Sequence, residues 1–283
     1  MNLDELDSRS ILELIVDEDA KVALAVKNEV PAINKVVLRL KDILQSGGRL
    51  FYIGAGTSGR MGVVDAAECP PTFGTDPKQI QAIVAGGKEA VFRSQEGAED
   101  SEENGAKEIE IHAIGSNDMV IGIAASRRTP FVIGSLRKAH EMGAATVLLT
   151  TNPRSSVDTS FLFEAICPEV GPEVLMGSTR MKSGLAQKMV LTMITTTTMV
   201  LLGKVYENMM IDLQLTNKKL AERAKRIIML ATDSDYEKAA DLLEKSGGHV
   251  KTAIIMAKRN LGAEEARILL EKSSGFVKKA LFL

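Results

Sequence analysis

The chain has 283 residues and a net charge of −2, with 35 Lys and Arg against 37 Asp and Glu. This length allows one α/β domain with a smaller appendage. Neither the charge nor any basic stripe interleaved with aromatic residues favours a nucleic-acid partner. The two cysteines, Cys69 and Cys167, lie far apart without metal-ligand spacing, so we expect no disulfide and no metal site.

The sequence gives no indication of a membrane segment. Its first residues, through Asp7, are acidic where a signal peptide is basic and then apolar. The longest apolar run, from Met189 to Gly203, contains five threonines and is shorter than the ~20 residues that a membrane span needs. We therefore expect a cytoplasmic protein.

Residues 1–46 have helical periodicity and form a helical lead-in. A strand from Leu50 to Ile53 follows, then a glycine turn from Gly54 to Gly59 and a helix from Arg60 to Ala67. The double proline Pro70-Pro71 is expected to stop this helix.

Further strands alternate with helices, which predicts an α/β fold with a doubly wound parallel sheet and ligands at the carboxyl ends of its strands. We expect a long helix to run to about Tyr206 and a small helical bundle to follow it. The expected domains are 1–46, 47–207 and 208–283. The later strands are expected at Ile80–Val84, Asp118–Ala125, Ala145–Leu149 and Phe163–Cys167, and the bundle helices at Asn217–Leu230, Asp235–Lys245, His249–Arg259 and Ala263–Leu270.

Three hydroxyl-rich turns follow strands or precede helices. They contain Thr57-Ser58, Ser126 to Thr129, and Ser178-Thr179. Free N–H groups at a helix start attract anions, so these turns predict a site for a phosphate monoester. Arg60 and Lys182, beside two of the turns, would neutralise its charge.

A dinucleotide is the alternative ligand, because Gly54 to Gly59 fits the pattern GxGxxG. That fingerprint also needs an acidic residue at the end of the second strand to hold the ribose. Here the strand ends in Ala85-Gly86-Gly87, and Asp76 precedes it. Nicotinamide cofactors are therefore disfavoured.

Two carboxylates stand out as candidate acid–base groups. Glu68 is expected at a helix end just before the double proline, where the helix dipole and partial burial would favour the protonated form and suit a general acid. Glu99 lies among several acidic residues. For both, a solvated surface carboxylate is the more common situation.

Several motifs together resemble the N-acetylmuramic acid 6-phosphate etherases. The resemblance covers nearly the whole chain and implies a sugar isomerase (SIS) fold, a small C-terminal domain resembling ubiquitin-associated domains, and a cytoplasmic homodimer without a cofactor. The motifs are Gly54-Ala55-Gly56-Thr57-Ser58-Gly59-Arg60, Asp65-Ala66-Ala67-Glu68-Cys69-Pro70-Pro71-Thr72, Glu96-Gly97-Ala98-Glu99-Asp100, Gly122-Ile123-Ala124-Ala125-Ser126 and Gly177-Ser178-Thr179-Arg180-Met181-Lys182.

The resemblance implies cleavage of the ether between C3 of the sugar and D-lactate, by elimination followed by water addition, in cell-wall sugar recycling. It makes Glu99 the base and Glu68 the acid that protonates the departing lactate. The implied sugar-phosphate-binding residues are Gly56, Thr57, Ser58, Arg60, Ser126, Thr129, Ser178 and Lys182.

The chain departs from this resemblance at Arg127, where relatives commonly have glycine. If that glycine serves φ > 0 or a close approach of the ligand, Arg127 strains the loop or crowds the phosphate. If it crowds the loop, Arg127→Gly should tighten substrate binding. Alternatively, Arg127 points outward and is harmless.

A sugar-phosphate sensor without catalysis, of the glucokinase-regulatory-protein type, is the other function that we consider. The pair Glu68 and Glu99 distinguishes the two, since a sensor needs no acid and base.

A helix from Arg60 to Ala67 spans about 12 Å, longer than a hexose phosphate. Either the helix bends or breaks early at Gly62, or Glu68 serves the site of a neighbouring subunit.

Overall fold

The structure is a computed structural model that describes residues 2–215 and 218–283. It contains two compact units, one made of Met1–Ala67 and Lys78–Thr195, the other of Glu68–Pro77 and Thr196–Leu283. The division expected from the sequence, at residues 46 and 207, stays a prediction, because compactness alone does not tell which segments fold independently.

A five-stranded parallel sheet forms the centre of the first unit, with the order β2-β1-β3-β4-β5. From β1 the chain adds β2 on one side and β3 on the other, so the direction of winding changes at β1. This order confirms the predicted doubly wound sheet. The strands are β1 (Leu50–Gly54), β2 (Ile80–Val84), β3 (Met119–Ile123), β4 (Ala145–Leu149) and β5 (Glu164–Ile166).

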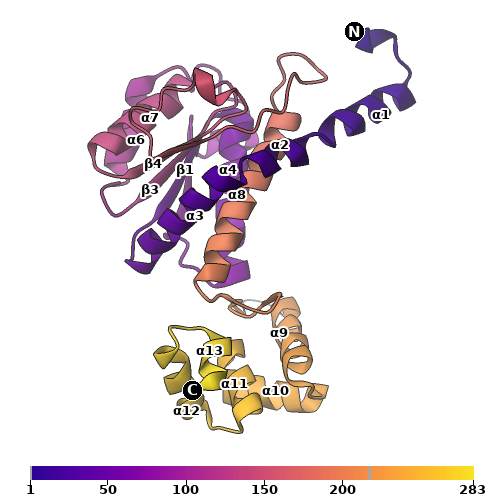
Figure 1. Ribbon diagram of the computed structural model, residues 1–283, viewed down its shortest axis with the longest axis vertical. Coiled ribbons are helices and arrows are strands. Elements are labelled where there is room, and N and C mark those ends of the chain that lie inside the picture. Colours follow the sequence, from indigo (N-terminus) through magenta and orange to yellow (C-terminus); the bar gives the residue numbers. More distant parts are fainter. Residues whose placement is uncertain (1, 216–217) are drawn as a thin grey trace. The chain divides into compact units, whose positions relative to one another are not determined.

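Helices cover both faces of this sheet, with α6 and α7 on one face and α3, α4 and the first part of α8 on the other (Figure 1). β1 and β3 are buried along their whole length, as their continuous apolar sequences predict. Gly122 lets α7 pack closely, because a Cβ there would lie 2.7 Å from the side chains of Val132 and Leu136. The helices are α3 (Val30–Gln45), α4 (Gly56–Phe73), α6 (Glu102–Ile111), α7 (Pro130–Glu141) and α8 (Lys182–Leu201).

The N-terminal helix α1 (Ser8–Asp19) projects from the sheet and buries none of its residues (Figure 1). Its Glu18 carboxylate lies 2.7 Å from the Nζ of Lys182, whose side chain is only 1% exposed. Hydrogen bonds from Lys182 and Lys21 lower the pKa of Glu18 to about 2. The short elements of this unit are η1 (Leu3–Glu5), α2 (Val22–Asn28), α5 (Glu89–Phe92) and η2 (Arg154–Ser156).

The expectation that α4 ends before its double proline was wrong, because the helix continues to Phe73. Pro70 and Pro71 each remove one N–H donor, but their fixed φ is compatible with helical backbone. Gly74, with φ +63°, follows the last helical residue and donates its N–H to the carbonyl of Pro70 at 2.9 Å. A left-handed glycine therefore terminates α4, as in many helices.

The second unit confirms the expected helical bundle, whose core is formed by buried apolar residues of all its helices. The helix α8 ends at Leu201 and not near Tyr206, because Gly203 has φ +75° and a two-stranded hairpin follows. Asn217, where the first bundle helix was expected to begin, lies outside the described residues. The elements are β6 (Val205–Tyr206), β7 (Met209–Met210), α9 (Lys218–Thr232), α10 (Tyr236–Lys245), α11 (Val250–Arg259), α12 (Ala263–Lys272) and α13 (Val277–Phe282).

The likeness of this bundle to ubiquitin-associated domains stays a prediction. Within the described ranges, none of the helices has the length and apolar character that a membrane crossing requires.

One carboxylate in the second unit lies close to several basic side chains. Asp212 Oδ2 lies 2.8 Å from the Nζ atoms of both Lys204 and Lys251, and its Oδ1 lies 3.8 Å from His249 Nε2. Burial lowers the pKa of Lys251, while the charge of Asp212 opposes this effect. Asp212 therefore keeps an ammonium group stable in a place that is largely closed to water.

We expect Asp212→Asn to lower the free energy of unfolding by about 3 kcal/mol, because Lys251 would remain buried without a counter-charge. Urea denaturation of the purified chain measures this change. Asp241→Asn is the matched control, since it removes the same group from a pair with Lys245 whose side chains are 62% and 51% exposed. Exposed pairs contribute at most about 1 kcal/mol, so equal losses in the two variants would contradict the assignment.

We expect Glu18→Gln to lower the melting temperature, and this difference from the wild type should depend on pH. A carboxylate with a lowered pKa stabilises the fold above its ordinary pKa of 4.5, and the effect is lost as the pH falls toward about 2. The gap between wild type and variant should therefore be constant above pH 4.5 and shrink below it.

Thermal unfolding followed by circular dichroism between pH 3 and pH 7 measures this gap. Glu13→Gln is the control in the same helix, because Glu13 pairs with Arg9 and both side chains are mostly exposed. A gap of the same size at every pH would refute a stabilising role of the Glu18 carboxylate.

Candidate functional site

The turn between β1 and α4 is tight enough to require glycine at both of its sides. A Cβ on Gly54 would lie 2.6 Å from the backbone nitrogen of Gly59, and one on Gly59 would lie 2.7 Å from the carbonyl oxygen of Gly54. The helix begins at Gly56, so Thr57 and Ser58 belong to its first turn and are half-buried. The first N–H groups of a helix lack partners within it, which gives this turn its capacity for an anion.

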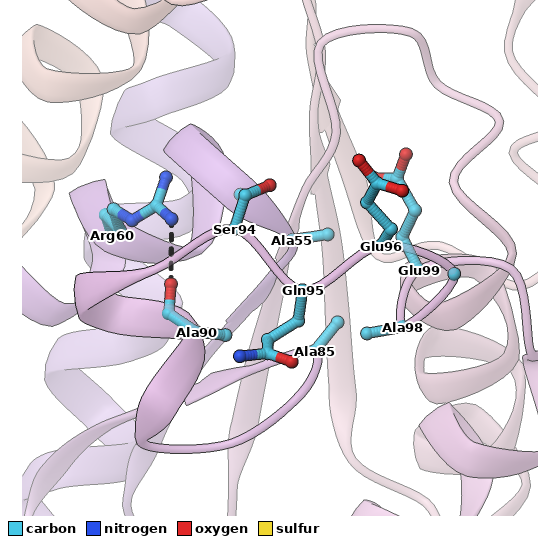
Figure 2. A pocket seen from close by; sticks show the side chains of 11 residues that line it. Ala55, Arg60, Ala85, Ala90, Ser94, Gln95, Glu96, Ala98 and Glu99 are labelled. Atoms are coloured by element: carbon cyan, nitrogen blue, oxygen red, sulfur yellow. Dashed lines mark hydrogen bonds between the residues drawn. The ribbon is translucent and has the colours of Figure 1, made fainter.

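A cavity of about 300 Å³ opens beside this turn, at the carboxyl ends of β1 and β2 (Figure 2). Of the predicted site residues, it brings together Gly56, Arg60 and Glu99. Its other lining residues are Ala55, Ala85, Ala90, Ser94, Gln95, Glu96, Gly97 and Ala98.

The loop that carries Glu99 is held at two points. The carbonyl of Glu99 accepts a 3.0 Å hydrogen bond from the N–H of Phe131, in the first turn of α7. Gly86, with φ +85°, lets Gln95 approach, since a Cβ there would lie 3.0 Å from that of Gln95. The end of β2, where a dinucleotide-binding protein has an acidic residue for the ribose, has glycine instead. Gly86 there makes room for the loop that carries Glu99. The side chains of Glu96 and Glu99 extend in the same direction (Figure 2).

Arg60 lines the cavity but also fixes its wall. Its Nε and Nη2 donate to the carbonyls of Val91 and Ala90 at 2.9 and 2.8 Å, and Figure 2 shows the second of these bonds. These two carbonyls belong to the short helix α5. The guanidinium therefore supports the segment that leads to the Glu99 loop.

The second hydroxyl-rich turn leads into α7. Thr129 is the N-cap residue and Pro130 the first helical residue, and no side-chain capping bond forms. Ser126 Oγ accepts a 3.4 Å hydrogen bond from the N–H of Arg128. Neither Ser126 nor Thr129 lines the cavity with Glu99.

Arg127 in this turn has φ +58°, a backbone conformation that glycine adopts without strain. Its side chain lines a separate cavity, on the side of α7. Each of the two expectations for Arg127 thus holds in part. The backbone is strained, as the first expected, but the side chain does not line the cavity with Glu99, which agrees with the second.

The third turn, before α8, already contains a carboxylate. Glu173 accepts hydrogen bonds from the N–H groups of Lys182 and Ser183, at 2.9 and 3.0 Å. The ammonium of Lys182 pairs with Glu18, and the N–H of Ser178 donates to the carbonyl of Leu175 at 3.1 Å. Neither Lys182 nor Ser178 is among the residues that line the cavity with Glu99.

Glu68 is exposed and lies in the continuous helix α4, twelve residues after Gly56. At 1.5 Å per residue this is about 18 Å along the helix axis. The helix does not break at Gly62, so the break considered from the sequence was wrong. Glu68 is also neither buried nor at a helix end, and these were the two premises for assigning it an acidic role from sequence alone.

Sequence reasoning missed Ser94, Gln95 and Glu96 as lining residues of the cavity. The available signal was Gly97, which has φ +74° and marks a turn within the acidic segment.

Among the described residues, no group of three His, Cys, Asp or Glu side chains could hold a metal ion. Burial raises the pKa of the Cys167 thiol to about 11, so this thiol is protonated at neutral pH.

Comparisons with known proteins give closely similar relatives for nearly the whole chain. It is 55% identical to the N-acetylmuramic acid 6-phosphate etherase of Salinibacter ruber, over 90% of this chain and 82% of the relative. It is 52% identical to the protein of the same name from Clostridium beijerinckii, over 90% of this chain and 84% of the relative.

Two further similarities concern the fold. A family profile for the glucokinase regulatory protein N-terminal SIS domain matches residues 32–140. A solved structure of a candidate phosphosugar isomerase involved in capsule formation, from Bacteroides fragilis NCTC 9343, superimposes with a TM-score of 0.52 at 18% identity. That superposition covers 76% of this chain and 95% of the other.

The fold expected from the sequence, a SIS-like parallel sheet followed by a helical region, is therefore confirmed. Identity above one half, over most of the length of both proteins, is far more than a shared fold requires. The chain belongs to the N-acetylmuramic acid 6-phosphate etherase family.

Proposed function

We propose that the protein cleaves the D-lactyl ether of N-acetylmuramic acid 6-phosphate and releases N-acetylglucosamine 6-phosphate and D-lactate. The observation that carries this proposal is the identity of 50% and more with etherases over about 90% of the chain. A sensor of the glucokinase-regulatory-protein type is not favoured, because the matching profile covers only residues 32–140.

The reaction begins with proton removal from C2 of the ring-opened sugar, where the neighbouring aldehyde makes this proton acidic. Glu99 is the base in this proposal, because its carboxylate borders the cavity at the glycine turn. The C3–O bond then breaks, and a second carboxyl group, assigned to Glu68, gives its proton to the departing lactate oxygen. Water adds to the resulting double bond, with hydroxyl at C3 and hydrogen at C2, and the ring closes.

The phosphate is assigned to the first turn of α4, where Gly56, Thr57 and Ser58 begin the helix. Arg60 supports the wall of the same cavity. Ser126, Thr129, Ser178 and Lys182 stay proposed contacts to the sugar phosphate, and they need a rearrangement or a partner subunit to reach it.

The second subunit is the proposed source of the acid. A continuous helix separates Glu68 from the turn at Gly56 by about 18 Å, which exceeds the length of a hexose phosphate. In a homodimer, Glu68 of one subunit would serve the cavity of the other. Leu12, Val16 and Leu24, each more than 60% exposed, offer apolar surface on α1 and α2 for such an interface. We further propose that this dimer works in the cytoplasm and without a cofactor.

We expect Glu99→Gln to reduce D-lactate release by about a hundredfold to ten-thousandfold while N-acetylglucosamine 6-phosphate still binds, since only the base is lost. An enzymatic lactate assay and calorimetry measure the two properties. Glu96→Gln is the matched control, because Glu96 lines the same cavity and its side chain points the same way. Equal losses in the two variants would contradict the assignment of Glu99 as the base.

The shared site is tested with mixed dimers, purified through two different tags after co-expression. A dimer of Glu68→Gln and Glu99→Gln subunits should regain about half of the wild-type activity, because one of its two sites has both carboxylates. Each variant alone should be inactive. A dimer of wild type and the double variant should also be inactive, and activity there would show that each subunit carries a complete site.

A further inference from the structure

A second cavity lies between α7 and the loop that joins β4 to β5, and it shares no lining residue with the cavity at Glu99. Its volume is about 240 Å³, enough for a ligand of fragment size. It is lined by Glu102, Arg127, Arg128, Ile133, Arg137, Leu148, Ser156, Val157, Asp158 and Phe161.

Three guanidinium groups border this cavity, and only one of them has an acidic partner within it. Arg137 lies 3.3 Å from Glu102 and stacks over the ring of Phe161 at 5.5 Å. Over the part of the chain that the structure describes, neither Arg127 nor Arg128 forms an ion pair. The Asp158 carboxylate accepts a 3.0 Å hydrogen bond from the N–H of Ser160. Positive charge therefore gathers at one rim without full compensation.

Arg127 reaches this rim at a conformational cost. Its φ of +58° lies in the left-handed region, which side chains with a Cβ adopt with strain. Its N–H donates to the carbonyl of Ala124 at 2.9 Å, so the turn is well formed in spite of this strain. Local strain of this kind is found where binding or catalysis uses it.

The floor of the cavity is apolar. Leu148 and Phe161 are 2% and 9% exposed, and Ile133 and Val157 complete the floor. Buried apolar surface next to charged donors suits a ligand with an anionic group and a compact apolar body.

We infer that this cavity is a binding site for a small organic anion, a carboxylate or a phosphate monoester, whose charged group lies against Arg127 and Arg128 and whose apolar body lies on Phe161. The bound anion would supply the negative charge that Arg127 and Arg128 lack among the described ion pairs. This site is distinct from the etherase cavity and does not depend on the proposed function.

Isothermal titration calorimetry with three probes of similar shape tests this inference. Benzoate, phenyl phosphate and benzyl alcohol share one aromatic ring and differ in their charged or neutral group. We expect at least one of the two anions to bind the wild type, and benzyl alcohol to bind at least tenfold more weakly. The stronger anion identifies the preferred group, and equal binding of benzyl alcohol would overturn the proposal.

Two variants test the assigned residues. Arg127→Gly and Arg128→Ala should each weaken binding of the anion about tenfold. Arg127→Gly suits the backbone at this position and should not unfold the chain. The matched control is Arg226→Ala, which removes an exposed positive charge from α9. Unchanged affinity in both variants, or an equal loss in the control, would refute the site.

Phenyl phosphate also has a group that the glycine turn could bind, so a blocking variant separates the two cavities. Val157→Phe fills the second cavity, and Val157 is not among the lining residues of the first. We expect this variant to lose anion binding and to keep D-lactate release. Anion binding that survives in Val157→Phe would place the probe elsewhere and overturn the proposal, whether or not the chain is an etherase.

Discussion

The close contact between β1 and α4 determines the position of everything else at the candidate site. Because Gly54 and Gly59 have no side chains, the helix can start directly at the end of the central strand. Any Cβ at either position would move the helix start away from the sheet. The same contact places the first turn of α4 beside the ends of β1 and β2, where the winding of the sheet changes direction. The tight turn at the start of α4 therefore depends on the absence of side chains at Gly54 and Gly59.

Glu99 reaches this turn through backbone interactions, although its own side chain is exposed. The hydrogen bond from Phe131 joins its carbonyl to the start of α7, and Gly86 admits the preceding residue Gln95. The segments that follow β1, β2 and β3 thus all meet at Glu99. The backbone of Glu99 is thus fixed, while its side chain is exposed. A proposed base needs both properties, since it must approach the substrate and still be ready before the substrate arrives.

Sequence patterns predicted the sheet well, because buried parallel strands are continuous apolar runs and glycine turns separate them from helices. β4 matches its expected bounds, and β3 is only trimmed at its ends. The end of α4 was wrong, since Pro70 and Pro71 looked like a stop whereas the left-handed Gly74 supplies it. The roles of the site residues stay predictions. Of these residues, Gly56 and Arg60, named from the glycine turn, and Glu99, named from the family resemblance, line one cavity. Local sequence does not tell which of three similar turns faces that cavity.

The three turns differ because the protein itself supplies anions to one of them. At the start of α8 the carboxylate of Glu173 binds the N–H groups of Lys182 and Ser183, as a phosphate would. Glu18 neutralises the ammonium of Lys182, which leaves little positive potential there. At the start of α7, positive charge exceeds negative charge, but Arg127 and Arg128 face the second cavity. Of these three described turns, the start of α4 is the one that lines a cavity with the proposed base Glu99. The distribution of internal carboxylates, which no local motif records, thus distinguishes the helix start to which the phosphate is assigned in the proposed function.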